Sequence, residues 1–183
     1  MKLTIFLTTL AVISASAQTA PMKPAPVAAS IGNIELSSVP FQVIRGLEKD
    51  MDARISTTGG KNPCNVLSAS RGLYVSGLGA VFSAEVELAP TPGTVGLFQT
   101  AISPEQKAKY RRDKLTNLPL LEQALREMAL ALDASPALKL SDNDQVVVAA
   151  RLVYRAWEDV TAMPGQIVAH LDRRGGTVKL EVQ

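Results

Sequence analysis

Residues 73–88 read LYVSGLGAVFSAEVEL and alternate between apolar and polar side chains on both sides of two glycines. A period of two is the pattern of a strand with one buried face, and two such runs around a glycine-containing turn predict a β-hairpin. With Gly77 and Leu78 as a two-residue loop, Leu73 faces Phe82 and both lie on the core face. The chain is therefore expected to contain an antiparallel sheet.

A second glycine pair, Gly175-Gly176, separates two further alternating runs near the C-terminus. A two-residue loop there predicts another hairpin, in which His170 lies opposite Glu181. His170 is the only histidine, so any catalytic triad or histidine-rich metal site would depend on it. The cross-strand partnership with Glu181 favours a structural role for this side chain.

Residues 145–157 form a third strand-like run, QVVVAARLVYRAW, that is largely apolar on both faces. A strand with two apolar faces is typical of the middle of a sheet. Arg151 and Arg155 share one face of this predicted central strand.

Three stretches have the periodicity of amphipathic helices. The first begins after Pro40 and ends before Gly59, with apolar residues at three- and four-residue steps. The second begins at Ser103, where Gln106 completes a capping box. A third begins at Asn117 as its cap and ends before Pro136.

Strands and helices arranged in blocks and joined by tight turns predict an α+β domain. We expect a mostly antiparallel sheet, built from two hairpins and a central strand, with about three helices packed on one face.

The N-terminus has the features of an export signal. A positively charged start, an apolar run of about 11 residues and the small-x-small sequence Ala15-Ser16-Ala17 predict a secretory signal peptide over residues 1–17, cleaved near Ala17. The apolar run is shorter than the roughly 18 residues that cross a membrane, so no membrane span is predicted. Residues 18–32 are rich in proline and alanine and predict a flexible leader. A short strand is expected at 34–39, within one domain over 33–183.

Removal of residues 1–17 leaves 166 of the 183 residues, with 18 Lys and Arg against 17 Asp and Glu after loss of Lys2. A formal charge of +1 gives no reason to expect nucleic-acid binding. The single cysteine, Cys64, has no partner for an internal disulfide, which leaves an inert buried thiol or an intermolecular bridge.

Four charged residues form the first candidate ligand site. Glu85 and Glu87 lie two positions apart on the first hairpin and are expected to share its solvated face, and paired carboxylates can flank a reacting bond or bind a hard cation. Arg151 and Arg155 could bind an anion beside them. Cross-strand pairing between these arginines and glutamates explains the same pattern without a ligand.

A second candidate site is the segment KAKYRRDK at 107–114, the densest positive charge in the chain. Lys107, Arg111 and Lys114 share one helical face, with Tyr110 available for stacking, which suits a phosphate- or sulfate-bearing polymer. A solvated helix face is the alternative interpretation.

The signatures of several common chemistries are missing from the chain. The Gly-x-Ser-x-Gly, Ser-x-x-Lys and His-Glu-x-x-His spacings of hydrolases are absent, and Gly77-Leu78-Gly79 lacks the third glycine of a dinucleotide-binding loop. The acidic turn at 141–144 lacks the later ligands of a calcium loop. No catalytic residue, metal or cofactor is predicted.

Two classes of function remain. The first is a secreted or periplasmic, non-catalytic binding or assembly module whose partner is a protein or small ligand in the envelope or outside the cell. The alternatives are a small enzyme that uses Glu85, Glu87, Arg151 and Arg155, and a polyanion-binding protein that uses the basic helix at 107–114.

Overall fold

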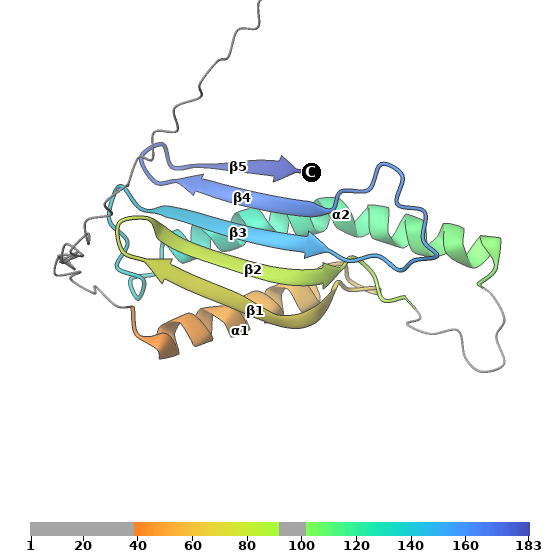
Figure 1. The fold of residues 1–183 in the computed structure, drawn as a ribbon, viewed down its shortest axis with the longest axis horizontal. Coiled ribbons are helices and arrows are strands. Elements are labelled where there is room, and N and C mark those ends of the chain that lie inside the picture. Colours follow the sequence, from red (N-terminus) through yellow and green to blue (C-terminus); the bar gives the residue numbers. More distant parts are fainter. Residues whose placement is uncertain (1–38, 92–101) are drawn as a thin grey trace, which may run out of the picture. The chain divides into compact units, whose positions relative to one another are not determined.

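A computed structural model describes residues 39–91 and 102–183 of the chain. These residues form two helices and five strands (Figure 1). In chain order the elements are α1 (Phe41–Thr57), β1 (Asn65–Val75), β2 (Gly79–Glu87), α2 (Pro104–Asp133), β3 (Gln145–Leu152), β4 (Gln166–Asp172) and β5 (Thr177–Val182). The predicted signal peptide, the predicted leader and the strand expected from residue 34 lie outside the described residues, apart from Val39.

The strands form one mixed sheet in the order β1-β2-β3-β4-β5. Neighbouring strands are antiparallel except β2 and β3, which run parallel. The predicted α+β class is confirmed, and β3 occupies the predicted central position. The sheet is mixed rather than purely antiparallel, with three of its four strand pairs antiparallel. The prediction of about three helices is wrong, because the described residues form two.

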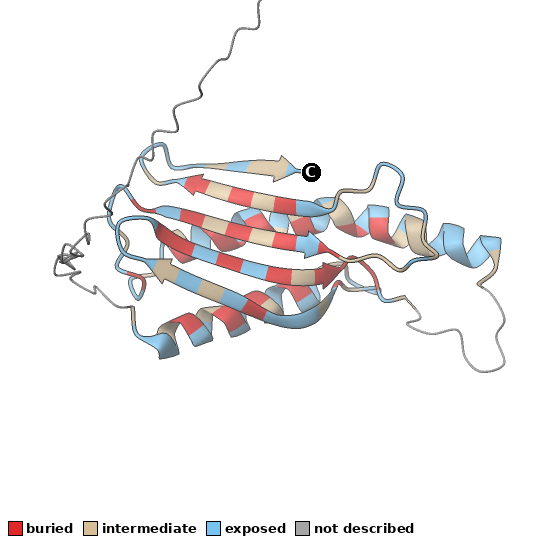
Figure 2. Cartoon of the chain, in the orientation of Figure 1, coloured by how far each residue is buried: buried red, intermediate tan, exposed pale blue. Residues whose placement is uncertain are grey.

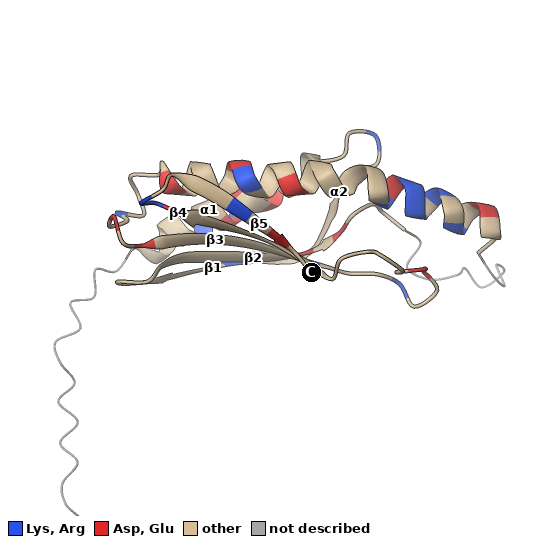
Figure 3. Ribbon diagram, turned by 90° about the horizontal axis from the view of Figure 1, so that it is seen from above, with Lys and Arg blue, Asp and Glu red and all other residues tan. Residues whose placement is uncertain are grey.

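Both helices cover the same face of the sheet, as Figure 3 shows. Helix α1 packs against β1, and α2 packs against β3 and β4. Burial alternates along the inner strands because every second side chain points toward the helices (Figure 2). The opposite face carries no helix from the described part of the chain.

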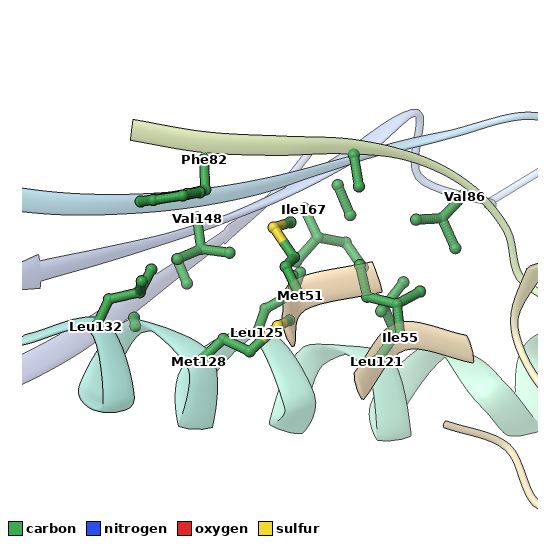
Figure 4. Packing of buried hydrophobic residues seen from close by; sticks show 14 of the residues in the cluster. Met51, Ile55, Phe82, Val86, Leu121, Leu125, Met128, Leu132, Val148 and Ile167 are labelled. Carbon is green, nitrogen blue, oxygen red and sulfur yellow. The ribbon is translucent and has the colours of Figure 1, made fainter. Parts of the chain in front are cut away.

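The core lies between this sheet face and the two helices (Figure 4). Its labelled members are Met51, Ile55, Phe82, Val86, Leu121, Leu125, Met128, Leu132, Val148 and Ile167. Full burial of one such side chain contributes about 1.5–3 kcal/mol to stability. The helical periodicity of the sequence correctly predicted which side chains of α1 and α2 belong to the core.

Helix α1 also covers the outer edge of β1. Glu48 Oε1 accepts a hydrogen bond from the Gly72 amide at 2.8 Å, and Asp52 Oδ1 accepts one from the Ser70 amide at 3.0 Å. Burial of Glu48 opposes ionisation, but the Gly72 amide and the Arg45 guanidinium outweigh it and lower the pKa of this carboxyl. Carboxylates on α1 therefore satisfy edge amides that would otherwise be available to another strand.

Helix α2 is continuous, so the break predicted at Asn117 is wrong. Asn117 is buried, and its amide nitrogen donates to the carbonyl oxygens of Asn62 (2.6 Å) and Leu88 (2.5 Å) instead of capping a helix. These contacts tie α2 to the turn after α1 and to the end of β2. The predicted capping box at Ser103 and Gln106 is confirmed.

The unbroken helix accounts for the parallel strand pair. A helix of 30 residues is about 45 Å long, whereas the 9 residues of β2 span about 30 Å. One helix of this length carries the chain from the end of β2 back to the end of the sheet where β2 began. Strand β3 therefore starts beside the start of β2, with Gly79 paired to Gln145.

The predicted register of the first hairpin is wrong by one residue. Leu73 pairs with Val81 instead of Phe82, because the loop holds three residues, 76–78. A shift of one residue moves a side chain to the other face of the sheet. Leu73 is accordingly 61% exposed, whereas Phe82 is buried.

The predicted register of the second hairpin is wrong by two residues. Each side chain therefore stays on its predicted face of the sheet but has a different cross-strand partner. His170 pairs with Lys179 instead of Glu181, because the loop holds the four residues 173–176. The Arg173 guanidinium donates to two carbonyl groups in the loop before β3, at 2.8 and 2.6 Å. This anchoring keeps Arg173 out of the strand ladder.

Cys64 is a free, buried thiol. Burial raises its pKa to about 11, so the thiol is protonated at neutral pH. Both properties agree with an inert side chain.

Replacement of Gly79 by alanine should disrupt the parallel pair. Its φ is 115°, and a Cβ atom would lie 1.9 Å from the Gln145 carbonyl oxygen. Gly77 is the matched control, because its φ is 77° but its surroundings are open. We expect Gly77→Ala to lower the free energy of unfolding by about 1–2 kcal/mol and Gly79→Ala to lower it by about 3 kcal/mol or more. Urea denaturation measures both, and equal losses would contradict the close approach of β2 and β3.

Candidate functional site

The first half of α2 and the connection between β3 and β4 enclose a pocket of about 450 Å³. Tyr110, Trp157 and Met163 provide its apolar walls, and Lys107 and Arg111 lie at its rim. In Figure 3 this end of α2 carries the concentration of basic residues that the sequence predicted. The pocket brings all four residues of the predicted polyanion site, which include Lys114, together with residues that the sequence did not identify.

Lys114 lies at the base of the pocket, and its side chain is 1% exposed. Its ammonium group donates to both carboxylate oxygens of Glu158, at 2.8 and 2.7 Å. The same nitrogen lies 5.3 Å from the centre of the Tyr154 ring, within the range of a cation–π interaction. Lys114 is therefore an interior cation and does not belong to a solvated helix face.

Glu87 joins this cluster from the end of β2. Its Oε1 lies 3.8 Å from Lys114 Nζ and 3.3 Å from Arg155 Nε, and the hydroxyl of Thr91 donates to it. The Arg155 contact is an ion pair without a well-directed hydrogen bond. Two cations thus face two carboxylates, Glu87 and Glu158. We call these four residues the buried charge cluster.

Removal of one member from such a cluster leaves an uncompensated buried charge, which costs more than the intact cluster contributes. Lys114, Glu87 and Glu158 come from α2, from β2 and from the β3–β4 connection. The cluster therefore fastens three separate parts of the chain to one another.

The rim of the pocket is held by a second set of contacts. The Arg111 guanidinium donates to the Asp159 carboxylate at 2.5 Å and to the carbonyl oxygens of Asp159 and Thr161, both at 2.8 Å. Hydrogen bonds from Thr161, together with the Arg111 charge, lower the pKa of Asp159. The rings of Tyr110 and Trp157 are 5.9 Å apart. The β3–β4 connection is thus fixed to α2 along the pocket wall.

The lining residues carry a small positive charge. Lys107, Arg111 and Lys114 are set against Glu158 and Asp159, which leaves one net positive charge. Arg111 and Lys114 are paired within the pocket.

Tyr154 lies beside the cluster as a neutral group. Burial, with a further contribution from the charge of Glu158, raises its pKa to about 12. Its hydroxyl donates to the Pro164 carbonyl oxygen at 2.6 Å. At neutral pH this phenol holds its proton and has a fixed partner.

The four residues of the carboxylate and arginine site are divided into two pairs. Glu85 and Arg151 form an ion pair of 2.8 Å on the sheet face opposite the helices, where Arg151 is 73% exposed. Glu87 and Arg155 belong to the buried charge cluster. The Glu85–Arg151 pair is a cross-strand pair of the anticipated kind, whereas Arg155 lies beyond the end of β3 and meets Glu87 outside the strand ladder. The expectation that Glu85 and Glu87 share one solvated face is wrong, because Glu87 is 2% exposed and faces the cations of α2 and the β3–β4 connection.

Sequence reasoning missed the segment that completes the pocket. It extended the central strand to Trp157, whereas β3 ends at Leu152. The only signal was the sequence Trp157-Glu158-Asp159, in which an aromatic residue adjoins two acids that could balance the basic helix.

Comparisons with protein-family models, with curated proteins and with solved structures yield no match to this chain. Over residues 39–91 and 102–183, no helix combines the length and the apolar character needed to cross a membrane. The same residues contain no group of three or more acidic, histidine or cysteine side chains arranged to hold a metal ion.

Replacement of Lys114 by methionine tests the buried charge cluster. The variant keeps the length of the side chain and leaves Glu158 buried without its cation, so we expect a loss of about 3–5 kcal/mol in the free energy of unfolding. Lys109 is the control, because it lies on the same helix and forms an exposed pair with Asp113 at 2.7 Å. Lys109→Met should change stability by about 0.5 kcal/mol or less in urea denaturation. Similar losses in the two variants would mean that the buried Lys114 pair contributes no more to the free energy of unfolding than an exposed pair does.

Tyr154→Phe tests the raised phenol pKa. The pKa in the folded protein, about 12, exceeds the unfolded value of about 10, so Tyr154 stabilises the fold fully below about pH 10. That contribution is lost as the pH rises toward the folded pKa. At neutral pH we expect the variant to lose about 1 kcal/mol with its hydrogen bond to Pro164, and the difference from wild type should shrink above about pH 10. Denaturation over a pH series would show a constant difference if Tyr154 ionised normally.

Proposed function

We propose that this protein is an exported, non-catalytic binding module. Its pocket on α2 takes a small molecule or peptide end group that combines an apolar or aromatic body with one negative charge. The observation that carries the proposal is a partly apolar pocket whose interior charges are already paired and whose rim keeps one excess positive charge.

The dimensions and walls of the pocket suit a small ligand. Ligand sites typically have volumes of about 300–1,000 Å³, with apolar and aromatic walls and a few polar groups that orient the ligand. Tyr110, Trp157 and Met163 are such walls, and Lys107 is a rim cation that an anionic group could approach. The ligand would lie against the aromatic rings with its charge toward Lys107.

The pairing of the charged groups favours binding over catalysis. General acids and bases work best when their pKa lies near the operating pH. Tyr154, with a pKa of about 12, keeps its proton at neutral pH. Glu158 and Glu87 each contact cations within the protein, so neither is free to approach a ligand. The alternative enzyme would need Glu85 and Arg151 to act with Glu87 and Arg155, and those two pairs lie in different environments.

The polyanion alternative has less support than pocket binding. A polymer of phosphates or sulfates requires several accessible cations in a row. Lys114 is buried, Arg111 is bound to Asp159, and Lys109 is paired with Asp113.

Export is the part of the proposal that rests on sequence alone. The signal-like residues 1–17 and the proline-rich leader at 18–32 favour a periplasmic or extracellular module that keeps the leader as a spacer.

Trp157 provides the test, because it is the only tryptophan in the chain and lines the pocket. Titration of the mature protein with indole and phenyl carboxylates should change its fluorescence in a saturable way. The matching amides lack the charge and should bind about tenfold more weakly.

Lys107→Glu should weaken carboxylate binding by about tenfold or more, whereas Lys49→Glu on the exposed surface of α1 should leave it unchanged. Equal binding of the carboxylates and the amides would show that the negative charge of the ligand does not contribute to binding. Equal effects of the two variants would place the ligand outside this pocket.

A further inference from the structure

The two edges of the sheet differ in how far their backbone groups are bonded to other parts of the protein. The edge at β1 is covered by α1, whose carboxylates accept the Gly72 and Ser70 amides. Strand β5 forms the other edge of the sheet. Among the described residues, one side chain bonds to the β5 backbone: Arg126 donates to the Val178 carbonyl oxygen at 3.3 Å. A strand edge that keeps free donors and acceptors is a template for another strand.

The hydrogen bonds to β4 show which groups of β5 point outward. Gln166 and Gln183 exchange both of their backbone hydrogen bonds, at 3.0 and 3.1 Å. In an antiparallel ladder the bonded pairs recur at every second residue. Lys179 and Glu181 therefore bond to β4, and the amides and carbonyls of Val178, Leu180 and Val182 face away from the sheet.

We infer that a second copy of this chain docks on this edge, with the two β5 strands antiparallel about a two-fold axis at Leu180. The outward groups of Val178 would then bond to those of Val182 in the other copy, and Leu180 would bond to its own counterpart. One continuous sheet would run through both copies. This inference is independent of the proposed ligand pocket.

The charges on β5 favour a second copy of this chain as the partner, and they favour one pairing register between the two β5 strands. Lys179 and Glu181 pair with each other at 2.9 Å within β5, and with the axis at Leu180 each would also lie opposite the other's counterpart in the second copy. Opposite charges directly across a strand pair are favourable, and like charges are unfavourable. The edge is thus complementary to itself, as a two-fold interface requires.

The neighbouring registers lack this property. The outward groups align only when the axis passes through a residue, so the nearest alternatives centre on Lys179 or Glu181. The first would oppose two lysines, and the second would oppose two glutamates. Val182, which is 48% exposed, gains a neighbour in the Leu180-centred register, where Val178 of the second copy lies across from it.

A charge-reversal series tests the inference by sedimentation over a wide concentration range. Wild-type protein should dimerise, and Lys179→Glu or Glu181→Lys alone should each raise the dissociation constant by about tenfold. The double variant Lys179→Glu/Glu181→Lys recreates opposite charges across the axis and should restore wild-type association. Reversal of the exposed Glu85–Arg151 pair, which lies on β2 and β3, is the control and should change nothing.

Cysteine variants test the register. In the proposed dimer, residues 179 and 181 of opposite copies have Cα atoms about 4.5 Å apart, which suits a disulfide. A mixture of Lys179→Cys and Glu181→Cys proteins should crosslink on oxidation, whereas each variant alone should not. The buried Cys64 thiol, with its pKa of about 11, should not compete.

Several results would overturn the inference. They are a wild-type protein that remains monomeric at all concentrations, a dimer unaffected by either single reversal, and self-crosslinking of one cysteine variant alone. A monomer whose Leu180 amide is protected from hydrogen exchange would show that something other than a second copy covers the edge.

Discussion

The ion pair between Lys114 and Glu158 is the contact on which the arrangement of the pocket depends. It joins the middle of α2 to a connection between β3 and β4 that has no helix or strand of its own. Glu87 and Arg155 complete the balance of charge and include the end of β2. Because buried charges require partners, this cluster fixes the position of the connection, together with the packing of Tyr154 and Met163 against the core. The pocket walls at Tyr110 and Trp157 follow from that position.

Local features of the fold could be predicted from the sequence because their causes lie within a few residues. The proline before α1, the capping box at Ser103 and the apolar stripes of both helices act through short-range geometry. The central position of β3 was also predictable, since largely apolar residues on both faces favour a place with a strand on each side. The alternation at residues 73–88 and at 166–182 correctly predicted strands and turns there.

Features set by distant contacts could not be predicted. Asn117 has the chemistry of a helix cap, but its amide binds the carbonyls of Asn62 and Leu88, so the helix continues. That continuity makes β3 parallel to β2. Both hairpin loops make contacts with distant parts of the chain: the Leu78 carbonyl oxygen accepts from the Gln145 amide at 2.9 Å, and Arg173 donates to the loop before β3. Of the site, the basic helix was recognised, but Glu158 and Asp159 were not, because the one local signal, an aromatic residue beside two acids, does not show that they pair with a helix far away in the sequence.

A double-mutant cycle at Lys114 and Glu158 is the most direct test of this account. The free energy of unfolding would be measured for wild type, Lys114→Met, Glu158→Gln and the double variant. If the pair fastens the β3–β4 connection to α2, the coupling energy should be about 2–3 kcal/mol, because each single variant leaves a buried charge without its main counter-ion and the double variant contains neither charge. A coupling energy near zero would show that the two residues act independently, and the connection would then be held in place by other contacts.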